Sequence, residues 1–220
     1  MSMTLWLEPV ALSIGLASGP VLDHTVRSVG ARRTGSEQAG TGEADRRFQR
    51  VALSATAGIL EGLAALRFGA SWTLLAYAVF LPGLAVLAWC DGRYFLLPKR
   101  IQHPVTAISG GLLLAGTVAT GRWHQLLLAL ACGVVGFTIF CVLHVVNPKG
   151  LAFGDVRLAG SIALLVGWLG PRRTAVAFVL GSVLAAMVGI VLVASRRAGW
   201  RSRLPYGVFL AIGAAIAILA

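Results

Sequence analysis

SWTLLAYAVFLPGLAVLAWC, residues 71–90, is a run of twenty residues without a charged side chain, and Asp91 follows it directly. A helix needs about 20 predominantly apolar residues to cross the hydrocarbon core of a bilayer. Because a spanning helix satisfies its backbone polar groups within its own segment, a run of this length predicts a transmembrane helix. The run therefore indicates an all-α membrane protein with a carboxylate at the end of this helix.

The composition of the whole chain agrees with this interpretation. Of the 220 residues, 57% are hydrophobic and only 12% are charged, and the mean hydropathy is +0.82. Soluble domains typically carry about 25% charged residues, so a soluble fold is excluded. The formal net charge of +11 does not indicate nucleic-acid binding, because connections between transmembrane helices are rich in Lys and Arg for topological reasons. We expect membrane lipids as partners and no nucleic acid.

Seven further apolar stretches come near the same length, which predicts a polytopic helical bundle of about eight transmembrane helices. We expect one membrane-embedded domain over residues 1–220, with a polar cytoplasmic loop at about 28–50. Three pairs of stretches are separated only by short turns at Gly69, Gly121 and Gly170, which predicts antiparallel helical hairpins. The expected spans are residues 4–22, 51–69, 71–90, 104–120, 125–145, 156–170, 173–195 and 204–219.

Basic residues are distributed unequally between the two sides of such a bundle. With the N-terminus outside, the inner connections hold 15 of the 19 Lys and Arg residues. An excess of Lys and Arg is typical of cytoplasmic connections. The pattern therefore predicts that Asp91 and Asp155 both lie on the cytoplasmic side. The inner connections are residues 23–50, 91–103, 146–157 and 196–203.

Asp91 and Asp155 are the acidic residues that best fit a chemical role. Carboxylates at a bilayer boundary are costly and are usually kept for ion pathways, proton relays or catalysis. Each also has a simpler explanation, because Asp91 could cap a loop or pair with Arg93, and Asp155 could cap a helix N-terminus. Pro98 and Gly154 favour non-helical backbone beside the two carboxylates. The residues alone leave both interpretations open.

The other reactive groups are less informative. Glu61 lies inside the second expected span, where it could pair with a polar group, face a wet cavity or lie beside Arg67. Cys90, Cys132 and Cys141 form no Cys-x-x-Cys pair and are expected to be reduced thiols that pack as small apolar groups.

Two carboxylates that share one proton supply a base and an acid to one site. The ionised member takes a proton from a water molecule that attacks a peptide carbonyl, while the protonated member hydrogen-bonds the carbonyl oxygen. Like-charge repulsion separates the two titrations, which belong to the pair. This chemistry needs no metal and no cofactor. The Gly-x-Ser-x-Gly, phosphate-loop and His-Glu-x-x-His motifs of rival enzymes do not occur in the sequence.

Three separate stretches carry a resemblance to a known family. Asp91 followed by the pair Leu97-Pro98 looks like a first-aspartate motif, and FGDVRL at residues 153–158 looks like a second. LPYGVFL at residues 204–210 is similar to a closing Pro-Phe-Gly-Pro segment. In this order, the stretches resemble the type IV prepilin peptidases, which are intramembrane aspartic proteases of the Gly-x-Gly-Asp type (peptidase family A24).

The resemblance implies an aspartic endopeptidase of the bacterial cytoplasmic membrane, with its active site toward the cytoplasm. Its substrates would be prepilin or pseudopilin precursors of type IV pili or protein secretion, cut between a short basic leader and an apolar helix. Asp91 and Asp155 would be the catalytic dyad, and Gly154, Leu97 and Pro98 would bind substrate or shape the site. No metal and no cofactor are implied, and which aspartate is the base is left open.

The chain also departs from the family pattern. Ala152 replaces the first glycine of Gly-x-Gly-Asp, and Arg157 replaces the usual lysine. We expect Arg157, Lys99 and Arg100 to serve topology and lipid headgroups rather than substrate. The cytoplasmic region that carries two Cys-x-x-Cys pairs in bifunctional members is reduced to the loop at 28–50. Those members also N-methylate the new N-terminus with S-adenosylmethionine, so we expect peptidase activity alone.

Two alternatives stay open at this point. The same carboxylates could be ion ligands in a small proton- or ion-coupled membrane transporter. The motifs could also be degenerate in a catalytically inactive subunit of a pilus or secretion assembly.

Overall fold

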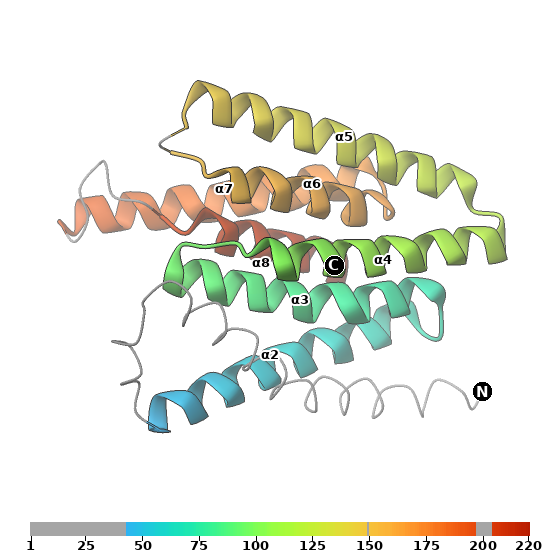
Figure 1. Cartoon of the computed structure of the whole chain (residues 1–220), viewed down its shortest axis with the longest axis horizontal. Helices are drawn as coiled ribbons and strands as arrows, with labels where there is room; N and C mark the ends of the chain where they lie inside the picture. The colour runs from blue at the N-terminus through green and yellow to red at the C-terminus, as the bar shows by residue number, and fades with distance from the viewer. Residues whose placement is uncertain (1–42, 149, 197–203) are drawn as a thin grey trace.

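The computed structural model describes residues 43–148, 150–196 and 204–220, and all the regular structure in these ranges is α-helical (Figure 1). The expected all-α fold is therefore confirmed. The helices are α2 (Glu43–Phe68), α3 (Trp72–Tyr94), α4 (Lys99–Thr120), α5 (Trp123–Val146), α6 (Phe153–Gly167), α7 (Pro171–Ala194) and α8 (Tyr206–Leu219).

Each of the seven expected spans within the described residues is a helix, but the count of eight transmembrane helices is not confirmed. By length and composition, residues 47–68 of α2 and the whole of α3, α5 and α7 are long and apolar enough to cross a membrane. With 15 residues, α6 rises only about 22 Å, which is less than the hydrocarbon thickness of a bilayer. The expected span 4–22 lies outside the described residues.

The boundaries differ most at the start of α2. This helix begins at Glu43, so its first eight residues fall in the segment that the polar composition assigned to a loop. The rest of that expected loop, residues 28–42, lies outside the described residues. The three tight turns agree with the expectation, because Gly69, Gly121 and Gly170 have φ angles of 54°, 71° and 112°. These are left-handed conformations that glycine adopts without a steric penalty.

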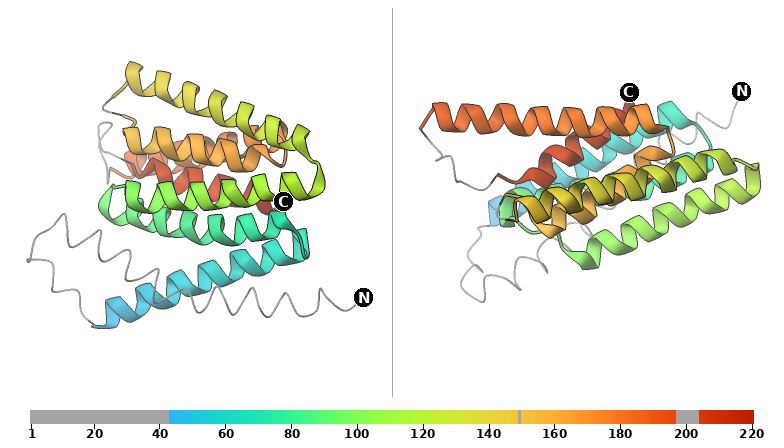
Figure 2. Two further views of the ribbon diagram at one scale, coloured as in Figure 1. Left: turned by 45° about the vertical axis from the view of Figure 1, so that its right-hand side comes forward. Right: turned by 90° about the horizontal axis from the view of Figure 1, so that it is seen from above.

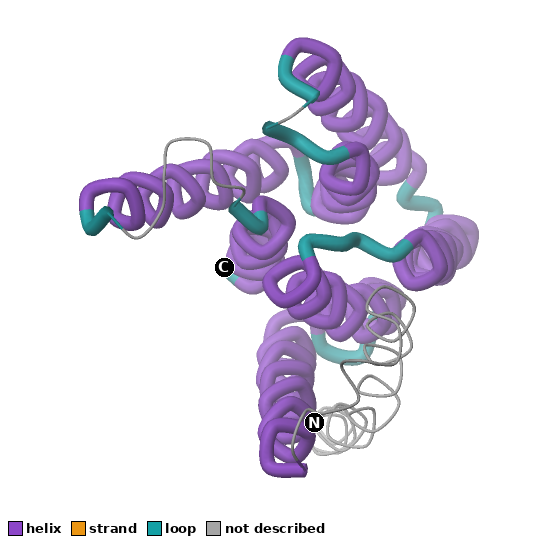
Figure 3. The backbone as a smooth tube through the Cα atoms, turned by 60° about the vertical axis from the view of Figure 1, so that its left-hand side comes forward, coloured by secondary structure: helices purple, strands orange, loops and turns teal. Residues whose placement is uncertain are grey.

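The helices run side by side, with α3, α6 and α8 near the centre and α2, α5 and α7 farther out (Figures 2 and 3). In the apolar segment of α3, 67% of the residues are buried, against 22% in α5 and 17% in α7. The outer helices therefore leave apolar faces for lipid. In the core, the buried Tyr77 hydroxyl of α3 donates a hydrogen bond to the Leu165 carbonyl of α6 at 2.8 Å.

The antiparallel order brings one end of each described helix to the same end of the bundle, on the left in Figure 1, and four of these ends adjoin the sequence motifs. They are the C-terminus of α3 and the N-termini of α4, α6 and α8. The first carries Asp91 and the third carries Asp155, so the fold brings the two sequence motifs to one end of the molecule.

Candidate active site

Asp91 lies in the last turn of α3, and its side chain is directed toward the start of α8. The residue is 6% exposed, and its Oδ2 accepts a hydrogen bond from the Val208 backbone N–H at 3.3 Å. The helix itself is ended by the Asp91 backbone carbonyl, which accepts from the Phe95 N–H at 2.8 Å. The main chain, rather than the carboxylate, therefore closes this helix end. The alternative of a pair with Arg93 stays a prediction.

Gly207 allows the first turn of α8 to come this close to Asp91. A Cβ atom at position 207 would lie 2.9 Å from the Asp91 Oδ2, which is closer than real Cβ contacts come. Gly207 and Val208 were not among the site residues expected from the sequence. Their only signal was the resemblance of residues 204–210 to a closing family segment, which says nothing of a contact with the first aspartate.

Asp155 occupies the first turn of α6. One oxygen, Oδ2, accepts a hydrogen bond from the Ala152 N–H at 3.1 Å, which is an interaction typical of a helix start. The other, Oδ1, is buried and has no hydrogen-bond partner among the described residues. Asp155 is therefore the third residue of the helix rather than its N-cap, which is Ala152, although one carboxylate oxygen accepts the hydrogen bond of the N-cap N–H. The other oxygen is available for chemistry.

The negative charge of Asp91 affects the titration of Asp155. Burial raises the pKa of Asp155 to about 6, with a smaller contribution from the negative charge of Asp91. The hydrogen bond from the Ala152 N–H acts in the opposite direction and lowers the pKa. Asp155 lies outside the four long apolar helices. A carboxyl group with this pKa holds its proton through much of the range below neutrality. The arrangement can therefore present one protonated and one ionised carboxyl group.

The Leu97 side chain packs beside residues next to both aspartates. It lies in the connection between α3 and α4, in which Phe95 has a left-handed φ of 51° and Pro98 is the residue before the first turn of α4. A Cβ atom at Gly154 would lie 3.1 Å from the Leu97 Cβ. A Cβ atom at Gly207 would lie 3.3 Å from the Leu97 Cδ1. The buried Leu97 side chain therefore packs between the starts of α6 and α8, and the structure brings Leu97 and Gly154 together.

Arg157 differs from its expected position at the lipid headgroups. Its Nη2 lies 3.5 Å from the Leu97 carbonyl oxygen, which makes a long hydrogen bond, and its guanidinium carbon lies 5.8 Å from the centre of the Phe153 ring. Its Nε and Nη1 atoms are buried without a partner in the described part of the chain. Lys99 and Arg100 are exposed, and their expected contacts with lipid headgroups stay a prediction.

Two further polar side chains are His144, in the last turn of α5, and Glu61, within α2. His144 Nδ1 lies 2.7 Å from the Leu151 carbonyl oxygen and fixes the connection between α5 and α6 just before Ala152. Glu61 is 1% exposed in α2. Among the described residues, no group of three or more His, Cys, Asp or Glu side chains is placed to hold a metal ion.

Comparison with known proteins gives a consistent set of matches. A family model described as the Type IV leader peptidase family matches residues 78–191, which include both aspartates. Three curated proteins named prepilin leader peptidase/N-methyltransferase are similar to this chain. The protein from Pseudomonas putida is 33% identical over 73% of this chain and 55% of its own length. The one from Stutzerimonas stutzeri is 29% identical over 74% of this chain and 55% of its own length, and the one from Bacillus subtilis is 28% identical over 71% and 60%, respectively. The chain thus spans little more than half the length of these curated relatives. No solved structure matches.

Proposed function

The chain belongs to the Type IV leader peptidase family, and on this basis we propose that it is an aspartic endopeptidase that removes the leader of prepilin-like or pseudopilin precursors. The observation that carries the proposal is the pair of buried carboxylates at one end of the bundle, Asp91 and Asp155. The matched relatives are named for leader peptidase activity on prepilins, which supports this substrate class.

The proposed reaction uses the pair as base and acid. Asp155 holds the shared proton, because burial and the charge of Asp91 both favour its neutral form. Asp91 takes a proton from the attacking water while Asp155 donates to the oxygen of the peptide carbonyl. The tetrahedral intermediate then collapses as a proton passes from the pair to the leaving amine. The unpartnered Asp155 Oδ1 supports its role as the group that meets the carbonyl.

We further propose that the site faces the cytoplasm of a bacterial cell, within the cytoplasmic membrane. Of the Lys and Arg residues that the structure describes, eight lie toward the end of the bundle that carries the aspartates (Arg46, Arg47, Arg50, Arg93, Lys99, Arg100, Arg157 and Arg196) and four at the other end (Arg67, Arg122, Arg172 and Arg173). Such an excess of cations is typical of cytoplasmic connections. We propose peptidase activity without N-methyltransferase activity, because the sequence contains no Cys-x-x-Cys pair.

A cleavage assay tests the proposal directly. A prepilin with a basic leader is incubated with the purified full chain in detergent, and the shortened product is measured by mass spectrometry. Asp91→Asn and Asp155→Asn are each expected to lower the rate at least about a hundredfold, the range of general acid–base catalysis. Asp45→Asn, remote in sequence from both motifs, is the matched control and should cleave normally. Normal cleavage by either site variant would refute the dyad.

A further inference from the structure

Helix α4 packs against both helices that carry the aspartates. Among the described helices, the backbones of α3 and α4 lie close together, as do those of α4 and α6, whereas those of α3 and α6 do not. The position of Asp91 on α3 relative to Asp155 on α6 therefore depends on the two helices whose backbones approach both, which are α4 and α8. Figure 1 shows α4 running alongside α3 from the end of the bundle that carries the aspartates.

Two consecutive residues of α4 contact the two partner helices. Val105 packs on α3, where a Cβ atom at Gly83 would lie 2.6 Å from the Val105 Cγ1. The glycine thus lets α4 approach α3 closely, as small residues do at helix contacts in membranes. The next residue, Thr106, contacts α6, because its hydroxyl donates a hydrogen bond of 2.9 Å to the Ser161 Oγ. Helix α4 is therefore joined to α3 by close packing and to α6 by a hydrogen bond.

Three hydrogen bonds meet at the Ser161 hydroxyl. The hydroxyl donates to the Arg157 carbonyl oxygen, one turn earlier in α6, at 3.0 Å. It accepts from the Thr106 Oγ1 at 2.9 Å and from the Gln102 Nε2 at 3.4 Å. A hydroxyl group has one donor and two acceptor positions, so Ser161 uses its whole capacity. Gln102 and Thr106 lie one turn apart on the same face of α4 and share this partner.

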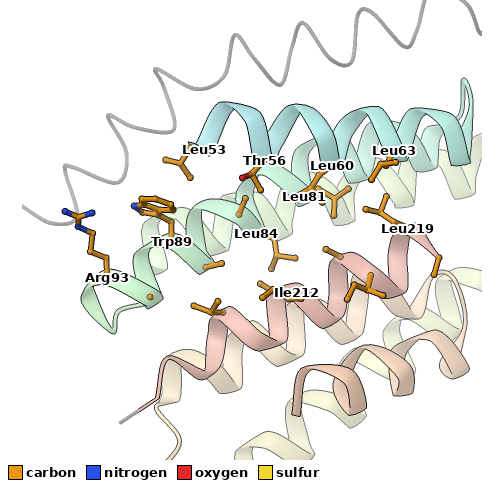
Figure 4. A pocket seen from close by; sticks show the side chains of 18 residues that line it. Leu53, Thr56, Leu60, Leu63, Leu81, Leu84, Trp89, Arg93, Ile212 and Leu219 are labelled. Atoms are coloured by element: carbon orange, nitrogen blue, oxygen red, sulfur yellow. The ribbon is translucent and has the colours of Figure 1, made fainter. Parts of the chain in front are cut away.

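This polar contact contrasts with the apolar surfaces elsewhere in the bundle. The groove between α2, α3 and α8 is lined mainly by leucine, isoleucine and alanine side chains (Figure 4). Helix α4 instead buries Gln102, which is 2% exposed, while its Ile108 and Val118 are 53% and 67% exposed. Lipid tails are as apolar as leucine, so hydrogen bonds between helices help to decide how the helices associate in a bilayer.

The hydrogen-bonded turns of α4 and α6 adjoin the candidate active site. On α6, Asp155 lies only two residues before Arg157, whose carbonyl oxygen accepts the Ser161 hydrogen bond. On α4, the backbone N–H of Gln102 donates to the Pro98 carbonyl, so the bonded turn follows the connection that holds Leu97. A displacement of α4 relative to α6 would therefore move this connection, and the end of α3 before it, relative to Asp155.

We propose that Gln102, Thr106 and Ser161 are positioning residues of the peptidase, whose hydrogen bonds hold α6 on α4 and so keep Asp155 at its working distance from Asp91. The inference rests on the proposed function and adds residues that act through the two aspartates. A misplacement of about 1 Å can lower a rate on the order of a hundredfold, so hydrogen bonds outside the dyad can control kcat.

Removal of one hydroxyl group tests the proposal in the full-length protein. Thr106→Val keeps the shape of the side chain and deletes its hydrogen bond to Ser161. Thr117→Val is the matched control, because the buried Thr117 hydroxyl donates to the Leu113 carbonyl of the same helix. We expect Thr106→Val to lower kcat for prepilin cleavage at least about tenfold with KM within about twofold, and Thr117→Val to leave both within about twofold. Thr106→Ser keeps the hydroxyl and should restore kcat to within about threefold of wild type.

A double-mutant cycle separates this role from a purely structural one. Ser161→Ala removes the shared partner and should itself lower kcat at least about tenfold, and adding Thr106→Val should slow it by no more than about twofold further. Adding Thr117→Val to Ser161→Ala should give the product of the two single effects.

The outcomes distinguish this inference from the proposed function. If wild-type protein cleaves and Thr106→Val has the same kcat as Thr117→Val, the inference is wrong and the proposed function stands. A Thr106→Val protein with a lower melting temperature but an unchanged kcat per folded molecule would likewise overturn the inference, because the hydrogen bond would then serve stability alone. Wild-type protein that does not cleave, or Asp91→Asn protein that cleaves normally, refutes both.

Discussion

The two ends of the bundle are built differently. At one end, α2 and α3, α4 and α5, and α6 and α7 are joined by turns of two or three residues. There Arg67 donates a hydrogen bond of 2.7 Å from its Nη1 to the Leu219 carbonyl, which is a well-made bond. At the other end, Arg157 has one long hydrogen bond and two buried nitrogens without a partner in the described residues. We call the first the closed end and the second the open end. We infer that the closed end serves stability and the open end serves chemistry, because the open end holds both aspartates beside the partly unpaired Arg157 guanidinium.

The largest effect is expected from a substitution that adds an atom at the open end, beside Asp91. Gly207→Ala puts a Cβ atom 2.9 Å from the Asp91 Oδ2, so α8 must shift and the Val208 hydrogen bond weakens. We expect a loss of prepilin cleavage of at least about thirtyfold, in line with the cost of misplacing a catalytic group. Gly110→Ala, where a Cβ atom meets nothing within 4 Å, is the control and should cleave at the wild-type rate.

A pair of leucine truncations compares the two ends at equal cost in stability. Leu97 and Leu74 are both buried, the first at the candidate site and the second near the start of α3. Leu97→Ala and Leu74→Ala should each lower the free energy of unfolding by roughly 2–5 kcal/mol. Cleavage by the folded protein should fall about tenfold only for Leu97→Ala, because Leu97 separates the starts of α6 and α8. Equal losses of activity would show that the two ends do not differ.

The titration of Asp155 tests whether the two carboxylates at the open end interact electrostatically. Its pKa of about 6 lies above the unfolded value of 3.8, so the neutral form is the one that folding favours. Relative to Asp155→Asn, the wild-type protein should be most stable below pH 4 and lose that advantage as the pH rises through 6. Carbodiimide labelling of Asp155, followed by mass spectrometry, should be half complete near pH 6. In Asp91→Asn the midpoint should move to lower pH, and an unmoved midpoint would mean that the carboxylates do not interact.

The smallest expected effect is at the closed end. Arg67→Gln removes the hydrogen bond to Leu219 and should cost about 1 kcal/mol of unfolding free energy. Prepilin cleavage should stay within twofold of wild type, as measured at saturating substrate. A large loss of activity from this variant would contradict the assignment of the closed end to stability.

The sequence predicted the helices well because apolar length is a local property that requires no knowledge of partners. The two aspartates and the Leu97-Pro98 and Gly154 positions also came from local patterns, and they converge at one end, although their catalytic role stays a prediction. The start of α2 was predicted too late because a charged segment can extend an apolar helix as easily as it can form a loop. The contact of Gly207 and Val208 with Asp91 could not be predicted, because it joins residues more than a hundred positions apart and depends on how α8 packs. The same holds for Arg157, whose partner is a backbone carbonyl rather than a charge.

Asp91 ends α3 with its main chain and meets α8 with its side chain. These two contacts use different atoms, so asparagine at this position preserves the carbonyl that terminates the helix and still offers an amide oxygen to the Val208 N–H. Only the negative charge is removed. An inactive Asp91→Asn protein with an unchanged melting temperature would therefore be a structural replica of the wild type, suited to capturing the uncut precursor for structure determination.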